Sequence, residues 1–113
     1  MQVNVNKVKI TTTVPPKHLN KVREAMFENG AGIIGDYTHC SYSSKVVGTF
    51  KPNEKANPFI GKANKLEFVD EYKLELVCDI EKVKMVLDGL RKAHPYEEPA
   101  IEIQPLIDES QFE

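Results

Sequence analysis

The spacing of apolar residues changes along this chain in an order that leaves few possible folds. Alternate residues are apolar or threonine over residues 8–14, as in a strand buried on one face. Apolar residues then recur every three or four positions over 19–27, as they do along one side of a helix. Pro15 and Pro16 separate the two segments, and Gly30 can end the helix because glycine readily adopts a left-handed conformation. The first 30 residues therefore predict a strand followed by a helix.

A hairpin of two strands should follow. Residues 36–50 are rich in Tyr, Val, Ser and Thr, which favours a strand, and 66–78 alternate between apolar and charged residues. The polar segment 51–65, interrupted by Pro52 and Pro58, reads as a long connecting loop. We expect one face of the last strand to be buried and the other to face water. The expected buried set is Leu66, Phe68, Tyr72, Leu74, Leu76 and Cys78, and the expected wet set is Glu67, Glu71, Lys73 and Glu75.

A second helix and a last strand complete the pattern. Asp79 is a candidate N-cap, and apolar residues at helical spacing continue to about residue 93, where His94-Pro95 ends the helix. These apolar residues are Ile80, Val83, Leu87 and Leu90. Ile101 and Ile103 then alternate with polar residues as a short strand.

The order strand, helix, strand, strand, helix, strand predicts an α+β fold. With right-handed crossovers it gives the ferredoxin-like βαββαβ sandwich, a four-stranded antiparallel sheet with two helices on one face. The 113 residues are enough for a single domain over 1–113, with a core at about 8–106 and a polar tail at 107–113.

Composition narrows the function classes. The chain is 41% hydrophobic and 28% charged, with a formal net charge of −2, so neither disorder nor a concentrated basic face is indicated. No apolar run approaches the roughly 20 residues of a membrane span, and the N-terminus does not resemble a signal peptide. We therefore expect a cytoplasmic protein with neither a nucleic-acid nor a membrane partner.

The two cysteines, Cys40 and Cys78, form no CxxC motif. If Phe50 lies opposite Leu66 in the hairpin, Cys40 falls within one position of Cys78, so the two could be neighbours. They are then either two small side chains in the sheet or a redox pair. We favour the first because intracellular thiols are normally reduced.

Residues Gly30, Gly32 and Gly35 match the GxGxxG pattern of dinucleotide-binding loops. That pattern requires a preceding strand and a following helix, whereas here a helix precedes and a strand follows. A structural turn is therefore the favoured interpretation, and the three glycines remain candidate ligand-binding residues.

The segment 94–99, HPYEEP, concentrates an imidazole, a phenol and two carboxylates between prolines. In one interpretation His94 and a glutamate bind a divalent cation such as zinc or copper, with His39, Glu67, a neighbouring subunit or water as further ligands. In the other, His94 bonds carbonyls at the helix end, Tyr96 packs, and the acids stay in water. His39 and Cys40 are adjacent in the expected strand, so they point to opposite faces and cannot readily hold one ion.

Five motifs in order resemble the YqfO-type domain, which occurs inserted in bacterial members of the NGG1-interacting-factor family and also as a free-standing protein. They are GAGIIGDY at 30–37, CSY at 40–42, GTFKP at 48–52, NPFIG at 57–61 and HPYEEPA at 94–100. The resemblance covers about 8–106 and implies the CutA-like, PII-like version of the fold and assembly as trimers. The HPYEEP segment also resembles CutA, a protein linked to divalent-cation tolerance. In the longer family members the paired-metal site belongs to flanking domains, so no catalytic residue is carried over.

We therefore predict a non-enzymatic, oligomeric sensor or interaction module, with a homotrimer favoured, that binds a divalent cation or small ligand at subunit borders. The candidate ligand-binding residues are Gly30, Gly32, Gly35, Tyr96, Glu97 and Glu98, and the candidate metal ligands are His39 and His94. One alternative is an accessory domain of a metal-dependent hydrolase that uses His94, Glu97 and Glu98. Another is the capping of a protein partner through Phe59 and Ile60 of the long loop.

Overall fold

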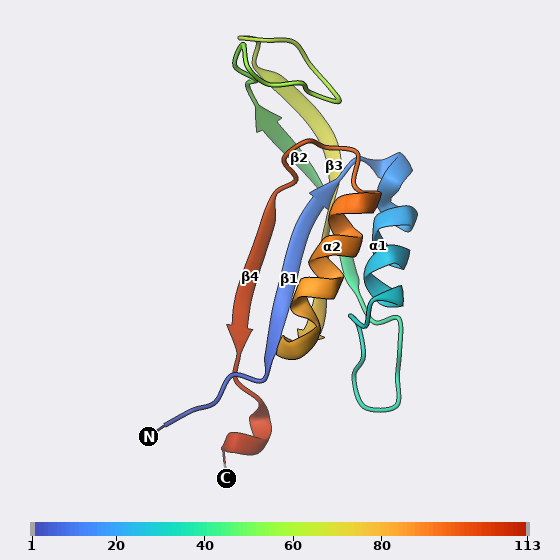
Figure 1. Ribbon diagram of the computed structural model, residues 1–113, viewed down its shortest axis with the longest axis vertical. Coiled ribbons are helices and arrows are strands. Elements are labelled where there is room, and N and C mark those ends of the chain that lie inside the picture. The colour runs from blue at the N-terminus through green and yellow to red at the C-terminus, as the bar shows by residue number, and fades with distance from the viewer. Residues whose placement is uncertain (1, 113) are drawn as a thin grey trace.

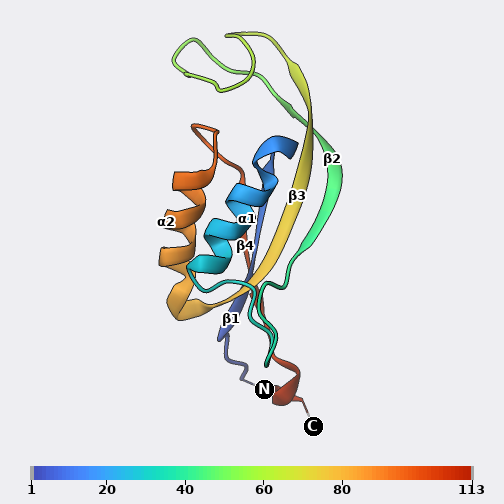
Figure 2. The same ribbon diagram turned by 90° about the vertical axis from the view of Figure 1, so that its right-hand side faces the viewer.

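The computed structural model describes residues 2–112, which form one antiparallel sheet covered on one face by two helices (Figures 1 and 2). The sheet order is β2-β3-β1-β4, so the two strands that precede helices lie in the middle. The elements are β1 (Lys7–Val14), α1 (Leu19–Glu28), β2 (Tyr42–Phe50), β3 (Glu67–Asp79), α2 (Val83–Ala93) and β4 (Ile101–Leu106), with 3-10 turns at Pro16–His18, Ile80–Lys82 and Glu109–Gln111. The predicted ferredoxin-like βαββαβ fold is confirmed.

The core lies between the helices and the central strands. Ile10 and Leu74 extend from β1 and β3 to meet Val22, Met26 and Leu90 of the two helices. All five are completely shielded from solvent. Their burial follows from the sequence periodicity, because every second strand residue and every third or fourth helix residue faces the same side.

The end of α1 has the predicted local stop signal, whereas the start of α2 lacks the predicted cap. The Gly30 and Ala31 amides donate to the carbonyls of Phe27 and Met26 at 3.0 and 3.1 Å, the two bonds of a Schellman ending, and Gly30 has a φ of 107°. The predicted stop at Gly30 is confirmed. Asp79, in contrast, makes no capping hydrogen bond, because a 3-10 turn separates it from the start of α2.

The second strand begins later than predicted. Residues 36–41 form a loop, so β2 starts at Tyr42 and the predicted strand over 36–50 is too long. The glycine-rich turn causes the difference: the Gly32 amide donates to the Val77 carbonyl at 2.8 Å, and the Cys40 amide donates to the Gly32 carbonyl at 2.9 Å. Gly32, rather than a residue of an extended β2, therefore bonds to this part of β3, and the regular β2–β3 pairing begins only at Tyr42.

The expected faces of β3 are wrong in its first half. Leu66 and Phe68 are exposed, whereas Glu71 is buried with an exposed fraction of 7%. β1 pairs with β3 only from Lys7–Asp79 to Val14–Tyr72, so residues 67–71 pair with β2 alone. In Figure 1 this part of the hairpin extends past the helices, so the helices do not cover the first half of β3.

The hairpin register places Tyr42 opposite Glu75, one residue away from the expected pairing. Cys40 lies in the loop before β2, and both Cys40 and Cys78 are free thiols. Burial, followed by the nearby Asp79 carboxylate, raises the pKa of the Cys78 thiol. Of the helices in residues 2–112, none has both the length and the apolar character that a membrane crossing requires.

Candidate functional site

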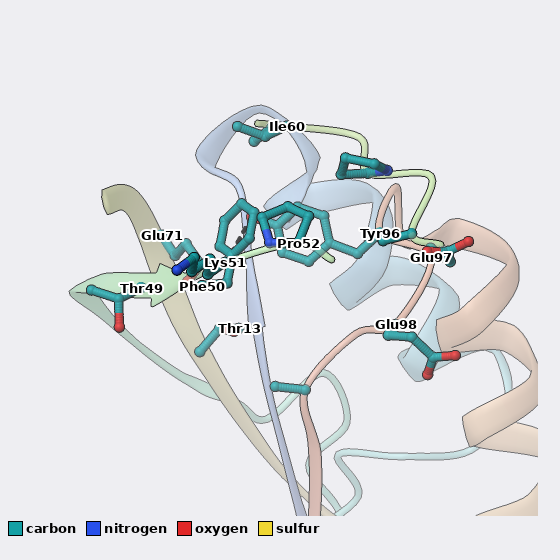
Figure 3. A pocket seen from close by; sticks show the side chains of 13 residues that line it. Thr13, Thr49, Phe50, Lys51, Pro52, Ile60, Glu71, Tyr96, Glu97 and Glu98 are labelled. Carbon is teal, nitrogen blue, oxygen red and sulfur yellow. Dashed lines mark hydrogen bonds between the residues drawn. The ribbon is translucent and has the colours of Figure 1, made fainter. Parts of the chain in front are cut away.

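A cavity of about 320 Å³ opens where the β2–β3 loop meets the segment between α2 and β4 (Figure 3). The HPYEEP segment contributes Tyr96, Glu97 and Glu98. The other lining residues come from the ends of β1 and β2, from β3, from the loop and from the residue before β4: Thr13, Thr49, Phe50, Lys51, Pro52, Ala56, Pro58, Ile60, Glu71 and Ala100. Mostly apolar walls with a few polar groups are typical of small-molecule sites.

A buried carboxylate and a phenol form the polar centre of this cavity. The Tyr96 hydroxyl donates a hydrogen bond to Glu71 Oε2 at 2.8 Å. Gly48 makes room for the other carboxylate oxygen, since a Cβ at that position would lie 2.0 Å from Glu71 Oε1. Burial, and then the hydrogen bond to Glu71, raises the pKa of Tyr96, so the phenol stays protonated as the donor.

His94 positions the HPYEEP segment through both of its ring nitrogens. Nε2 lies 2.7 Å from the carbonyl oxygen of Thr13, and the Tyr96 amide donates to Nδ1 at 3.1 Å. A carbonyl accepts and an amide donates, so the ring is neutral with its proton on Nε2. Burial lowers the pKa of His94. The carbonyl that it bonds belongs to β1, not to the end of α2 as expected.

The long loop folds back onto the same segment. The Asn57 amide donates to Glu97 Oε1 at 3.1 Å. The Phe59 ring contacts His18 edge-on, with ring centroids 5.5 Å apart, and lies 6.3 Å from the Tyr96 ring. The loop therefore forms a wall of the cavity and packs on its own chain, with Phe59 still half exposed.

The glycine-rich turn lies at the other end of the sheet in a single chain. It follows α1, whereas Tyr96, Glu97 and Glu98 follow α2, and Figure 1 shows the two regions at opposite ends of the helix layer. Gly30, Gly32 and Gly35 all have positive φ, and a Cβ at Gly32 would lie 2.7 Å from the Cys40 carbonyl oxygen. These glycines are needed by the turn itself.

The candidate metal ligands are also separated. His39 lies beside Phe27 near the glycine-rich turn, with ring centroids 4.8 Å apart, and its Nδ1 is 2.8 Å from the Thr38 hydroxyl. His94 lies at the opposite end and uses both nitrogens in backbone bonds. Within residues 2–112, no three His, Cys, Asp or Glu side chains gather closely enough to hold a metal ion.

Sequence reasoning missed Glu71, the buried carboxylate in the cavity lining. Glu71 was expected in water because the alternation of β3 places it opposite the apolar set, but Tyr96 and the β2–β3 loop share a cavity with it and shield it. The sequence did mark Phe50 and Pro52, because both belong to the GTFKP motif. No local sequence feature indicated that they would line the same cavity as Tyr96.

Comparison with known proteins identifies relatives. No family model matches the chain. It is 47% identical over 103 residues to a GTP cyclohydrolase 1 type 2 homolog of Halalkalibacterium halodurans, covering 91% of this chain and 28% of that protein. A protein of the same name from Bacillus subtilis is 44% identical over 98 residues, covering 87% of this chain and 26% of that protein. The chain thus spans about a quarter of the length of these relatives.

Solved structures agree with this match. A Bacillus cereus protein related to NIF3 superposes with a TM-score of 0.79 at 35% identity, covering 94% of this chain and 27% of that one. CutA1 from Shewanella sp. SIB1 superposes with a TM-score of 0.70 at 18% identity, covering 93% of this chain and 85% of that one. This likeness shows a shared fold. The chain is therefore a homologue of the YqfO-type segment of NIF3-related GTP cyclohydrolase 1 type 2 homologs, with a CutA-like fold.

Proposed function

We propose that this chain is a non-enzymatic, oligomeric binding module, with its domain core at about 8–106, that takes a small ligand in the cavity beside Tyr96. The observation that carries the proposal is the cavity itself, in which a buried carboxylate faces apolar walls under a loop held by Glu97. A loop that closes one side of a pocket couples ligand binding to its own conformation if the ligand favours one loop state.

Exposed apolar residues support the proposal that the chain forms an oligomer. Val47, Leu66 and Phe68 are more than half exposed on the projecting hairpin, where no helix covers them. A surface of this kind is typical of an interface. A trimer, as the family resemblance implies, would also allow the glycine-rich turn of one subunit to approach the HPYEEP segment of another.

A divalent cation, zinc or copper, is the second ligand class within this proposal. His39 and the Glu97 and Glu98 carboxylates are exposed, so a subunit border could bring them together. His94 would join such a site only by giving up a backbone bond.

Two measurements test the module. Light scattering at micromolar concentration should give the mass of a trimer, and a monomer would contradict the proposal that the chain is oligomeric.

Fragments that bind the protein should shift the NMR resonances of amides around the cavity. Ala56→Trp, which fills the cavity, should abolish these shifts. Ala63→Trp, in the same loop but outside the lining, is the matched control. Shifts that persist in Ala56→Trp would contradict the cavity as the site.

The alternative, an accessory domain of a metal-dependent hydrolase, is favoured by the name of the relatives, GTP cyclohydrolase 1 type 2 homolog. It predicts stoichiometric metal in the purified protein and hydrolysis that is lost in His94→Ala. Elemental analysis that finds no metal would count against it.

A further inference from the structure

The Glu71 carboxylate lacks a positive partner within the described chain. The salt bridges found among residues 2–112 are Lys9–Glu75 and Lys84–Asp88, and neither involves Glu71. Its side chain is buried, and the one hydrogen bond found for it there comes from Tyr96. A buried anion is costly unless it is paired and hydrogen-bonded.

The charges around the cavity favour a cation. Glu71, Glu97 and Glu98 contribute three carboxylates to the lining, and Lys51 contributes the one basic side chain. Figure 3 shows Glu71 and Lys51 on one side of Tyr96 and the Glu97 and Glu98 side chains on the other, so carboxylates lie on both sides of the ring. A positive group entering beside Tyr96 would be attracted by the net negative charge and could reach the Glu71 carboxylate, which has no positively charged partner among residues 2–112.

The walls favour an organic cation over a bare ion. Phe50 and Tyr96 present aromatic rings with centroids 6.5 Å apart, and Pro52, Pro58 and Ile60 add apolar surface. Aromatic faces attract ammonium groups, whereas a hydrated metal ion prefers several oxygen or nitrogen ligands. A cavity of about 320 Å³ is within the range that small organic molecules occupy.

We infer that the cavity binds a small organic cation, an amine with an apolar body, whose ammonium group pairs with Glu71 while its body packs against Phe50, Tyr96 and the loop prolines. This rests on the proposed function and names the class of ligand for the same cavity. The Tyr96 hydroxyl, already bonded to Glu71 Oε2, would leave Oε1 facing Gly48 as the other acceptor on that carboxylate.

Calorimetry with three matched probes tests the inference at pH 7. The probes are 2-phenylethylamine, 2-phenylethanol and 3-phenylpropanoate, which share a body and differ in charge. The amine should bind about tenfold or more tightly than the alcohol, because only the ammonium pairs with the buried carboxylate. Glu71→Gln should remove that preference, whereas Glu102→Gln, on the exposed face of β4, should retain it.

Equal binding of amine and alcohol, preferred binding of the acid, no binding of any probe, or an amine preference that survives in Glu71→Gln would each overturn the inference. The Ala56→Trp comparison separately decides whether the cavity binds ligands at all. If Glu71→Gln fails to fold, the ranking of the three probes on the unaltered protein decides the class of ligand.

Discussion

At the scale of single residues, the site is built from polar groups that are buried and depend on one another. Glu71 has its hydrogen bond from Tyr96, the Tyr96 amide bonds to His94, and His94 bonds to β1. Each of these bonds crosses between elements or turns the chain. Removing one partner therefore leaves another buried polar group without a bond.

Tyr96→Phe should destabilise the protein by about 1–3 kcal/mol, because the Glu71 carboxylate loses its hydrogen bond while remaining buried. Urea unfolding followed by circular dichroism measures the change. Tyr37→Phe is the matched control, since Tyr37 is largely exposed and its change should be close to neutral. An unaltered midpoint in Tyr96→Phe would show that the bond contributes little.

His94 should make stability depend on pH. Burial lowers its pKa in the folded state below the ordinary value of 6.5, so the unfolded chain takes up a proton first as the pH falls. The contribution of neutral His94 is complete above about pH 6.5 and decreases below it, toward the lower folded-state pKa. Protonation of Nδ1 would also remove the acceptor for the Tyr96 amide.

Unfolding experiments at about pH 7.5 and 5.5 check this expectation. The free energy of unfolding of the unaltered protein should fall more over this interval than that of His94→Gln, in which the other titrating groups are the same. If the free energy of unfolding changed equally with pH in the two proteins, groups other than His94 would be responsible for the pH dependence.

At the scale of elements, the β2–β3 loop is a wall of the cavity that few contacts hold in place. Its closure depends on the Asn57 amide bond to Glu97 and on the packing of Phe59 against His18 and Tyr96. Segments held by few buried contacts open more easily than the core. We therefore expect this loop to open more easily than the core strands and helices.

Phe59→Ser should loosen the loop with a small effect on global stability, because Phe59 is 53% exposed. Hydrogen exchange at the Asn57 amide should become about tenfold faster, while amides in β1 and α2 keep their rates. Phe112→Ser, another change of an exposed Phe to Ser, is the control and should leave the Asn57 rate unaltered. An unaltered Asn57 rate in Phe59→Ser would show that Phe59 does not hold the loop.

At the scale of the whole molecule, the hairpin extends past the helices and leaves apolar residues in water. Val47, Leu66 and Phe68 on the hairpin are more than half exposed, and exposed apolar patches are typical of interfaces, which is the basis of the proposed association. Phe68 is the most exposed of the set at 69%.

Phe68→Ser should weaken self-association by about tenfold or more if this face lies in a subunit contact. Light scattering over a dilution series measures the change, and circular dichroism should show an unaltered fold. Phe112→Ser again provides the control, because it removes an exposed aromatic ring outside the hairpin. Equal association of the two variants would place the contact elsewhere.

The strands, the helices and their order could be read from the sequence, because periodicity of two or 3.6 residues is a local property that a buried face imposes. The first strand, the helix ending at Gly30 and the βαββαβ order were predicted correctly for this reason. The start of β2 at Tyr42 was not, since the preceding turn is held by the hydrogen bond that its Gly32 amide donates to the Val77 carbonyl of β3, a strand distant in sequence.

Tertiary structure alone decided which polar groups share the cavity. Glu71 and Tyr96 lie 25 residues apart on different elements, and the alternation of β3 placed Glu71 in water. Its burial results from a hairpin longer than its neighbouring strand and from a loop that folds back over it. The periodicity of apolar residues shows which side chains lie on the same face of a strand or helix, but only the tertiary packing determines what covers that face.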